Sequence, residues 1–246
     1  MASLRMLESR IVRLVVESLC KQELRSLRCG IITALMFIRY LSIMRRVIII
    51  TKKINNCRKG VVMSERKLLE LTRAGNPILR EVMPEVSPED ILSNKVQDLI
   101  ADIRYTNQQK QYGVGLAAPQ VGVRVAMSVI GIKPTPNRPN LESFEQVIIN
   151  PKYEGIGEPV GMWEGCQSVG SGDDILYAQA HRYREIEAEW FNEKGEYNKR
   201  VLGGFVAHVF QHETDHMQGI LFVDRVADPK TYMMADEYRE RIANTN

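Results

Sequence analysis

A closely spaced pair of histidines is the pattern that most strongly indicates chemistry. His212 and His216 are four residues apart, and Glu213 directly follows the first of them. On a helix, positions i and i+4 share one face, so both imidazoles can bind one metal ion. Glu213 then lies beside the open coordination position, where a carboxylate can act as a base. The chain has only four histidines, which makes a chance pair at this spacing a weak explanation. Neutral imidazole nitrogen suits zinc or ferrous iron.

A third histidine, His208, lies one helical turn before His212. It does not complete the ligand set, because His208 and His216 are separated by roughly 12 Å of helix rise. One ion cannot reach both at bond lengths of about 2 Å. We expect His208 to line the site at most, or to be a partly buried polar residue.

The third ligand must therefore come from another segment, and the residues alone offer two sources. One is Cys166, the only cysteine after residue 62. A lone cysteine is a buried apolar residue, a reactive thiol or a metal ligand. The other source is an acid near Asp236 or Glu237, as a metallo-endopeptidase would use. Acids on a polar terminal helix more often form a solvated face.

Small residues dominate a turn at residues 113–120, which reads Gly-Val-Gly-Leu-Ala-Ala-Pro-Gln. Glycines at such a place indicate a turn, a bulge or a backbone that a ligand approaches closely. The turn lacks the Lys-Ser/Thr ending and the following helix of a phosphate-binding loop.

Three segments in this order resemble the motifs of the peptide deformylase family. That family has a Gly-x-Gly-Leu-Ala-Ala-x-Gln motif, a Glu-Gly-Cys-x-Ser motif and a His-Glu-x-x-His helix. All three are complete here, at residues 113–120, 164–168 and 212–216. The resemblance covers about residues 67–226. It implies hydrolytic removal of the formyl group from the N-terminal methionine of newly made polypeptides.

The same resemblance implies the roles of the site residues. One ion per chain, usually Fe²⁺ and often replaced by Zn²⁺, Ni²⁺ or Co²⁺, would be bound by Cys166, His212 and His216. A water would hold the fourth position, with Glu213 as the general base that takes its proton. The developing oxyanion would meet the side-chain N–H of Gln120 and the backbone N–H of Gln167.

The resemblance also implies how the substrate binds. The formyl-Met peptide of a nascent chain would add as a strand beside Val114 and Gly115, with its methionine side chain in an apolar pocket near Gly113 and the metal helix. Contact with the ribosome would be transient, and the catalytic domain would not stably bind nucleic acid or membranes.

One loop departs from the family pattern. Many bacterial members follow the cysteine motif with a proline and then an arginine that helps to seat the peptide. Residues 169–174 read Val-Gly-Ser-Gly-Asp-Asp instead. The departure affects peptide affinity and sequence preference, whereas the metal chemistry is untouched. Gln167 replaces a common leucine, but only its backbone is needed.

The elements that must position these residues follow from hydrophobic patterning. Apolar periodicity predicts helices over 88–110, 202–218 and 229–243. Short apolar or alternating runs predict strands over 124–130, 146–150 and 185–191. Residues 133–145, with three prolines, are expected to form a surface loop, and residues 192–195 a turn. We therefore predict an α+β fold, with mostly antiparallel sheets around a central helix that carries the His-Glu-x-x-His motif, and a C-terminal helix.

Charge divides the chain into two parts. Residues 1–62 contain thirteen lysines and arginines against three glutamates, a balance of +10, whereas residues 63–246 have a balance of −7. We expect a basic N-terminal extension over 1–62 and a catalytic domain over 63–246. The extension is a non-native upstream segment, a transit peptide or a membrane anchor. Three arginines, Arg39, Arg45 and Arg46, interrupt its apolar run and disfavour a transmembrane helix.

The cysteine pattern indicates a reducing compartment, because nothing suggests a secreted disulfide framework. We expect a cytoplasmic protein, or a mitochondrial or other organellar one if residues 1–62 are a transit peptide. A rival reading has no catalysis at all: a protein that binds the ribosome or nucleic acid through its basic extension.

Overall fold

The computed structural model describes residues 66–109, 113–135 and 139–243. The chain divides between Ser64 and Glu65, and only the second of the two units is described below. The predicted basic extension over 1–62 lies outside the described residues. Within the described part of the chain, no helix is both long and apolar enough to cross a membrane.

The main sheet has five strands in the order β1-β2-β3-β6-β7, and each neighbouring pair is antiparallel. Its strands are β1 Gly115–Ala117, β2 Met127–Ile132, β3 Phe144–Ile156, β6 Glu185–Phe191 and β7 Tyr197–Gly203. A smaller antiparallel sheet has the order β4-β5-β8, from Val160–Gly165, Leu176–Arg182 and Met233–Met234. The short strand β1 and the strand β4 each lie at an edge of their sheet.

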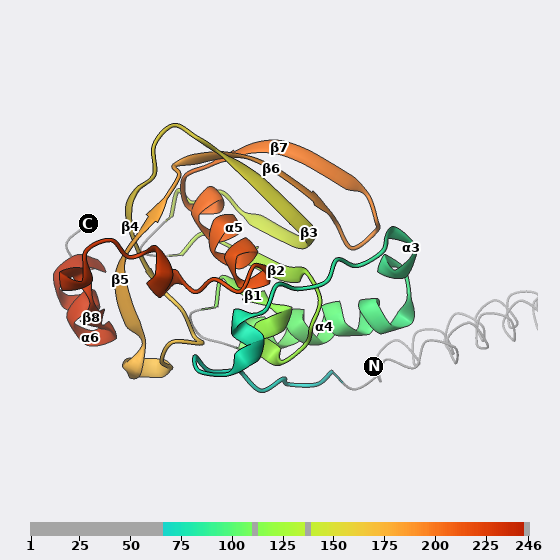
Figure 1. Cartoon of the computed structure of the whole chain (residues 1–246), viewed down its shortest axis with the longest axis horizontal. Helices are drawn as coiled ribbons and strands as arrows, with labels where there is room; N and C mark the ends of the chain where they lie inside the picture. The colour runs from blue at the N-terminus through green and yellow to red at the C-terminus, as the bar shows by residue number, and fades with distance from the viewer. Residues whose placement is uncertain (1–65, 110–112, 136–138, 244–246) are drawn as a thin grey trace, which may run out of the picture. The chain divides into compact units, whose positions relative to one another are not determined.

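Two helices cover opposite faces of the main sheet, as the alternation of side chains along β2 shows. Met127 and Val129 face helix α4 (Asn94–Gln109), together with Ile100 and Ile103. Ile130 faces helix α5 (Gly204–Met217) and packs in the same core cluster as Phe210 and Trp190. Figure 1 shows α5 at the centre, with α4 below strands β1 and β2. The predicted α+β class and central helix are confirmed.

Helix α5 ends where the sequence predicted, at Gly219. This glycine has φ +72°, and a Cβ on it would lie 2.6 Å from the carbonyl carbon of Arg80. Both the left-handed backbone and the close approach require glycine. The helix begins two residues later than predicted, because Leu202 and Gly203 end strand β7. That strand had no recognised pattern in the sequence.

The helix predicted over 88–110 is two helices. Ser87 caps α3 (Pro88–Ile91) by accepting a hydrogen bond from the N–H of Asp90, as the sequence indicated. The chain then turns, and Ser93 accepts from the N–H of Val96 in the first turn of α4. A serine that can cap a second helix allows the break, although the apolar spacing continues through it.

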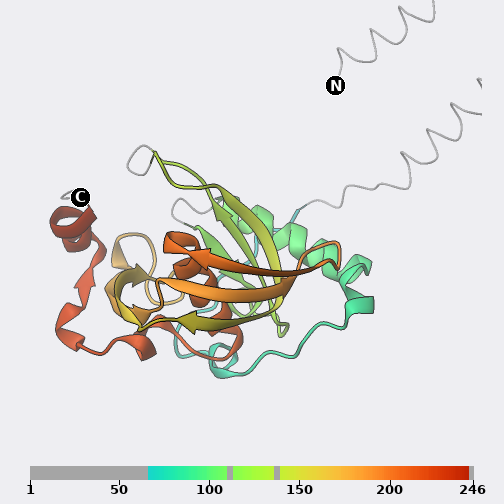
Figure 2. The same cartoon turned by 90° about the horizontal axis from the view of Figure 1, so that it is seen from above.

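The prediction of one C-terminal helix over 229–243 was wrong. The segment has a 3₁₀ turn at Pro229–Thr231, strand β8, a short α6 (Ala235–Tyr238) and a π-helical turn at Arg239–Ala243. Met233 and Met234 pair with β5, so sheet pairing prevails over helical patterning here. Both views place α6 at the end of the domain opposite α3 (Figures 1 and 2).

The predicted strands are correct in place but not all in extent. Strand β6 matches its prediction over 185–191, and the turn at 192–195 is present. Strand β2 begins three residues later than predicted. Strand β3 is much longer, because a register shift between Ile149 and Lys152 lets pairing with β6 continue past Asn150. Strands β4 and β5 were not predicted.

Candidate metal centre

Three side chains from two separate segments meet beside the start of β1. Cys166 directly follows strand β4, whereas His212 and His216 project from one face of α5. One ligand atom from each of the three lies within 4.8 Å of the other two. The downstream acids are elsewhere: Glu237 is on α6 and pairs with Arg241.

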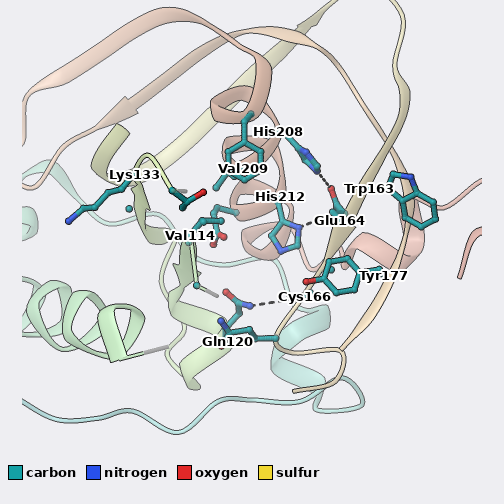
Figure 3. A pocket seen from close by; sticks show the side chains of 18 of the residues that line it. Val114, Gln120, Lys133, Trp163, Glu164, Cys166, Tyr177, His208, Val209 and His212 are labelled. Atoms are coloured by element: carbon teal, nitrogen blue, oxygen red, sulfur yellow. Dashed lines mark hydrogen bonds and ion pairs between the residues drawn. The ribbon is translucent and has the colours of Figure 1, made fainter. Parts of the chain in front are cut away.

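The ring of His212 is oriented by a buried carboxylate. Its Nδ1 lies 3.0 Å from Glu164 Oε1 and donates a hydrogen bond to it (Figure 3). Burial opposes the charged carboxylate, but His212, His208 and Arg182 lower the pKa of Glu164 well below its ordinary value. An ionised acceptor at Nδ1 leaves the Nε2 lone pair for an ion.

The sulfur of Cys166 is surrounded by hydrogen-bond donors. The side-chain amide of Gln120 and the backbone N–H of Ser168 each lie 3.4 Å from Sγ, and so does Nε2 of His216. Burial opposes the thiolate, but the two histidines lower the pKa of the Cys166 thiol well below its ordinary value. The thiolate is the form that binds metals.

This donor set fits a transition-metal ion. One thiolate and two imidazoles suit zinc or ferrous iron, whereas magnesium and calcium prefer carboxylate and carbonyl oxygen. Three protein ligands leave a fourth position for a reactant, as in catalytic metal sites. Cys166, His212 and His216 could therefore hold such an ion.

Glu213 lies next to this cluster and is held from two sides. Its Oε2 accepts a hydrogen bond from Ser128 Oγ at 2.8 Å, and both side chains are buried. On the other side, a Cβ on Gly115 would lie only 2.2 Å from Glu213 Oε1. Burial raises the pKa of Glu213 above its ordinary value, although His212, His216 and Ser128 act against it. A carboxylate with a raised pKa can exchange protons closer to neutral pH.

Gln120 is fixed by the turn that follows β1. Its Oε1 accepts from the N–H of Ala117 at 2.8 Å, so its amide N–H groups point toward Cys166 and Ser168. Gly122, with φ +77°, ends the 3₁₀ turn that carries it. Gln167 lines the pocket beside Cys166.

A buried network of ion pairs lies behind the cluster, and no pattern in the sequence indicated it. Arg182, only 1% exposed, bonds Glu164 through two nitrogens and Asp215 through a third. Asp215 also accepts two hydrogen bonds from Arg225. Although burial works against the cation, Glu164 and Asp215 raise the pKa of Arg182 above its ordinary value.

His208 belongs to the same network, as a buried residue and not as a ligand. Its Nε2 contacts Glu164 Oε2, and its ring meets that of Phe205 edge-on. Most polar side chains on the buried face of α5 have such partners, because an unsatisfied buried polar group is costly. No local motif marks Arg182; only Glu164 and Asp215 lie inside recognised patterns.

The cluster opens into a cavity of about 450 Å³. Gly113, Val114 and Gly115, for which the family resemblance implied substrate binding, line it together with Phe205, His208 and Val209 of α5. In Figure 3, Val114 lies on one side of His212 and Trp163 on the other. The pocket therefore places an edge of each sheet beside the candidate ion site.

Comparison with known families agrees with this geometry. The sequence profile of the family described as polypeptide deformylase matches residues 68–232. The chain belongs to the peptide deformylase family. Membership of this family makes the protein a hydrolase that removes the formyl group from N-terminal formylmethionine. The resemblance drawn from three motifs is thus confirmed.

Relatives of this deformylase cover most of the described domain. Peptide deformylase 2 of a Nostoc species is 36% identical over 178 residues, which are 72% of this chain and 96% of that protein. The peptide deformylase of Leptospira biflexa is 35% identical over 178 residues, 69% of this chain and 92% of that protein.

Solved structures of deformylases share the fold. A Met-Ala-Ser-bound class I type b peptide deformylase from Acinetobacter baumannii has a TM-score of 0.60 and 30% identity. The match covers 66% of this chain and 100% of that one. The peptide deformylase of Thermotoga maritima has a TM-score of 0.55 and 29% identity over 66% of this chain and 100% of its own.

Proposed function

We propose that this chain removes the N-formyl group from new polypeptides at an ion held by Cys166, His212 and His216. The observation that carries the proposal is the convergence of one sulfur and two imidazoles beside the carboxylate of Glu213. When bound, such an ion polarises the formyl carbonyl and lowers the pKa of water to about 7.

Glu213 moves the proton. Its carboxylate takes a proton from the attacking water and later delivers it to the departing amine nitrogen. Ser128 and the narrow space beside Gly115 fix that carboxylate in one position. A positioned general acid–base contributes roughly 10²–10⁴ in rate.

Gln120 and Gln167 stabilise the charge that develops on the formyl oxygen. The side-chain N–H of Gln120 is already directed toward Cys166, because Ala117 holds the other end of the amide. The backbone N–H of Gln167 is the second donor. One donor of this kind is worth roughly 10²–10³ in rate.

The substrate is an extended formyl-Met peptide that pairs with β1. Strand β1 lies at the edge of the main sheet and lines the pocket, which suits addition of a further strand. The methionine side chain then enters the part of the pocket formed by Val114, His208 and Val209. The Acinetobacter baumannii relative binds Met-Ala-Ser, which is the product that deformylation of formyl-Met-Ala-Ser would leave.

The physiological ion is Fe²⁺ in this proposal, with Zn²⁺, Ni²⁺ or Co²⁺ as functional replacements. A thiolate ligand makes the ferrous form sensitive to oxidation, so the enzyme works in a reducing compartment. That compartment is the cytoplasm, or an organelle if residues 1–62 act as a transit peptide. The enzyme meets nascent chains by transient contact with the ribosome.

Formate release from formyl-Met-Ala-Ser, with metal analysis of the same anaerobic sample, tests the proposal. We expect one ion per chain and formate release. Cys166→Ala loses both. Glu213→Gln keeps the ion and loses about 10²–10⁴ in kcat. Glu237→Ala, the matched control at an exposed side chain of α6, keeps both. A metallo-endopeptidase with an acidic third ligand predicts the reverse for Cys166 and Glu237.

A further inference from the structure

Three aromatic side chains form one wall of the pocket. Trp163 comes from β4, Tyr177 from β5 and Tyr238 from α6. The rings of Tyr177 and Tyr238 stack in parallel with their centroids 4.1 Å apart, and Trp163 tilts against Tyr238 at 5.7 Å. We call these three residues the aromatic wall. Nothing in the proposed chemistry uses it.

The aromatic wall adjoins the candidate ion site. Tyr177 pairs with Gly165, the residue before Cys166, in the β4–β5 register. A Cβ on Gly165 would lie 3.0 Å from Tyr177 Cε1, so the ring of Tyr177 covers this glycine. A molecule that reaches Cys166 along β4 therefore passes over the rings.

The C-terminal segment completes the wall. Strand β8 pairs Met233 with Tyr177 and Met234 with Leu176, and α6 follows directly. An ion pair between Asp173 and Arg239 holds the same segment to the turn before β5. Tyr238 is thus fixed against a ring that lies 61 positions earlier in the sequence.

Strand alternation decides which part of a substrate meets the wall. Glu164 points toward α5, where it bonds His208 and His212, so its neighbour Trp163 points to the opposite side of β4. The methionine pocket is on the α5 side. In an extended peptide the next side chain points the opposite way, which is the side of the aromatic wall.

We propose that the aromatic wall binds the side chain that follows the formylmethionine and selects peptides with an aromatic second residue. This inference rests on the proposed function and adds a substrate class to it. A flat uncharged ring suits the site because aromatic rings stack on one another. The carboxylates among the described pocket residues, Glu164 and Glu213, already bond other groups, so a cationic side chain gains no ion-pair partner there.

Formyl-Met-Phe-Ser and formyl-Met-Ala-Ser, compared on the metal-loaded full chain, test the inference. We expect kcat/KM to be roughly threefold to tenfold higher for the phenylalanine peptide, mainly through KM. Tyr238→Ala brings the ratio of the two kcat/KM values toward one. Tyr238→Phe, which keeps the ring, keeps the ratio.

Tryptophan fluorescence provides a direct measurement of peptide binding beside the kinetics. Trp163 lies in the wall, whereas the other tryptophan, Trp190, is buried in the core. We expect the product Met-Phe-Ser to shift the tryptophan emission of the wild-type protein, and Met-Ala-Ser to leave it nearly unchanged. Metal content and the thermal unfolding midpoint establish that each variant folds. If Tyr238→Ala does not fold, Trp163→Leu replaces it.

The outcomes separate the two proposals. Formate released equally well from both peptides, with no change of the ratio in the variants and equal emission changes, overturns the aromatic wall alone. No formate from either peptide overturns the proposed function, and the inference with it.

Discussion

Gly115 lies so close to the carboxylate of Glu213 that no side chain fits between them. A methyl group on Gly115 would lie 2.2 Å from Glu213 Oε1 and 2.6 Å from its Cδ. Cβ atoms essentially never approach other atoms this closely, so one of the two residues would have to move. The second glycine of the turn at 113–120 is thus required by the carboxylate on α5, which comes almost one hundred residues later.

Gly115→Ala should therefore displace the carboxylate of Glu213 while leaving the ion in place. We expect kcat for formyl-Met-Ala-Ser to fall by at least about 10²-fold, since a misplaced general base loses most of its effect. Steady-state kinetics with metal analysis measures this. Gly203→Ala is the matched control, because its Cβ would meet Glu185 at an ordinary 3.7 Å. A kcat within twofold of wild type for Gly115→Ala would contradict the assigned role.

Glu164→Gln should weaken ion binding. Glu164 orients the His212 ring through Nδ1, and partners of this kind are typically worth 10–100-fold in metal affinity. Competition for Zn²⁺ with a chromogenic chelator measures the dissociation constant. The exposed residue Glu185, changed to Gln, serves as the control. Equal affinities for wild type and Glu164→Gln would show that the ring is held by packing alone.

Arg182→Met should destabilise the domain. The substitution leaves Glu164 and Asp215 without their shared cation in a buried site, and breaking such a pair costs about 3–5 kcal/mol. Asp215 keeps Arg225, so the lower end of this range is expected. Urea unfolding gives the free energy. Arg184→Met, at an exposed position two residues along, should change it by less than about 0.5 kcal/mol.

Asp224→Asn should lower stability in a pH-dependent way. Burial opposes the charge, but Arg80 and the Leu221 N–H lower the pKa of Asp224 below its ordinary value. A carboxyl whose pKa is lower in the folded state stabilises the protein above the unfolded pKa. That stabilisation is lost as the pH falls through the folded-state pKa.

The side chains of Arg80 and Asp224 are each more than one third exposed, so solvent screening keeps the stability contributed by this ion pair small. We expect a loss of less than about 1 kcal/mol at pH 7. The difference should vanish in acid, once the pH falls below the folded-state pKa of Asp224. Urea unfolding of the metal-free protein at pH 7 and across the acid range measures it. A difference that persists in acid would mean that the lost interaction is not the charge.

The ligands could be predicted from sequence because each lies in a short contiguous motif. His212, Glu213 and His216 owe their arrangement to helix geometry, which a single segment determines. Cys166 could be chosen over Asp236 only through the family resemblance, because its approach to α5 depends on how β4 and β5 pack.

Other features depend on contacts between distant segments, which no local pattern records. Arg182 looks like any arginine in an alternating strand, and its burial follows from the meeting of β5 with α5. The C-terminal helix was mispredicted for the same reason: Met233 and Met234 have apolar side chains that suit a helix, but the free edge of β5 binds them as a strand.

A peptide bound in the pocket would connect the two sheets, because an edge strand lies on each side of it. Strand β1 ends one sheet and β4 ends the other, and residues of both line the same cavity. A peptide that pairs with each of them would join two separate hydrogen-bonded ladders into one. Amide hydrogens at both edges should then become protected from exchange together, so that occupancy of the pocket couples the opening of one half of the domain to that of the other.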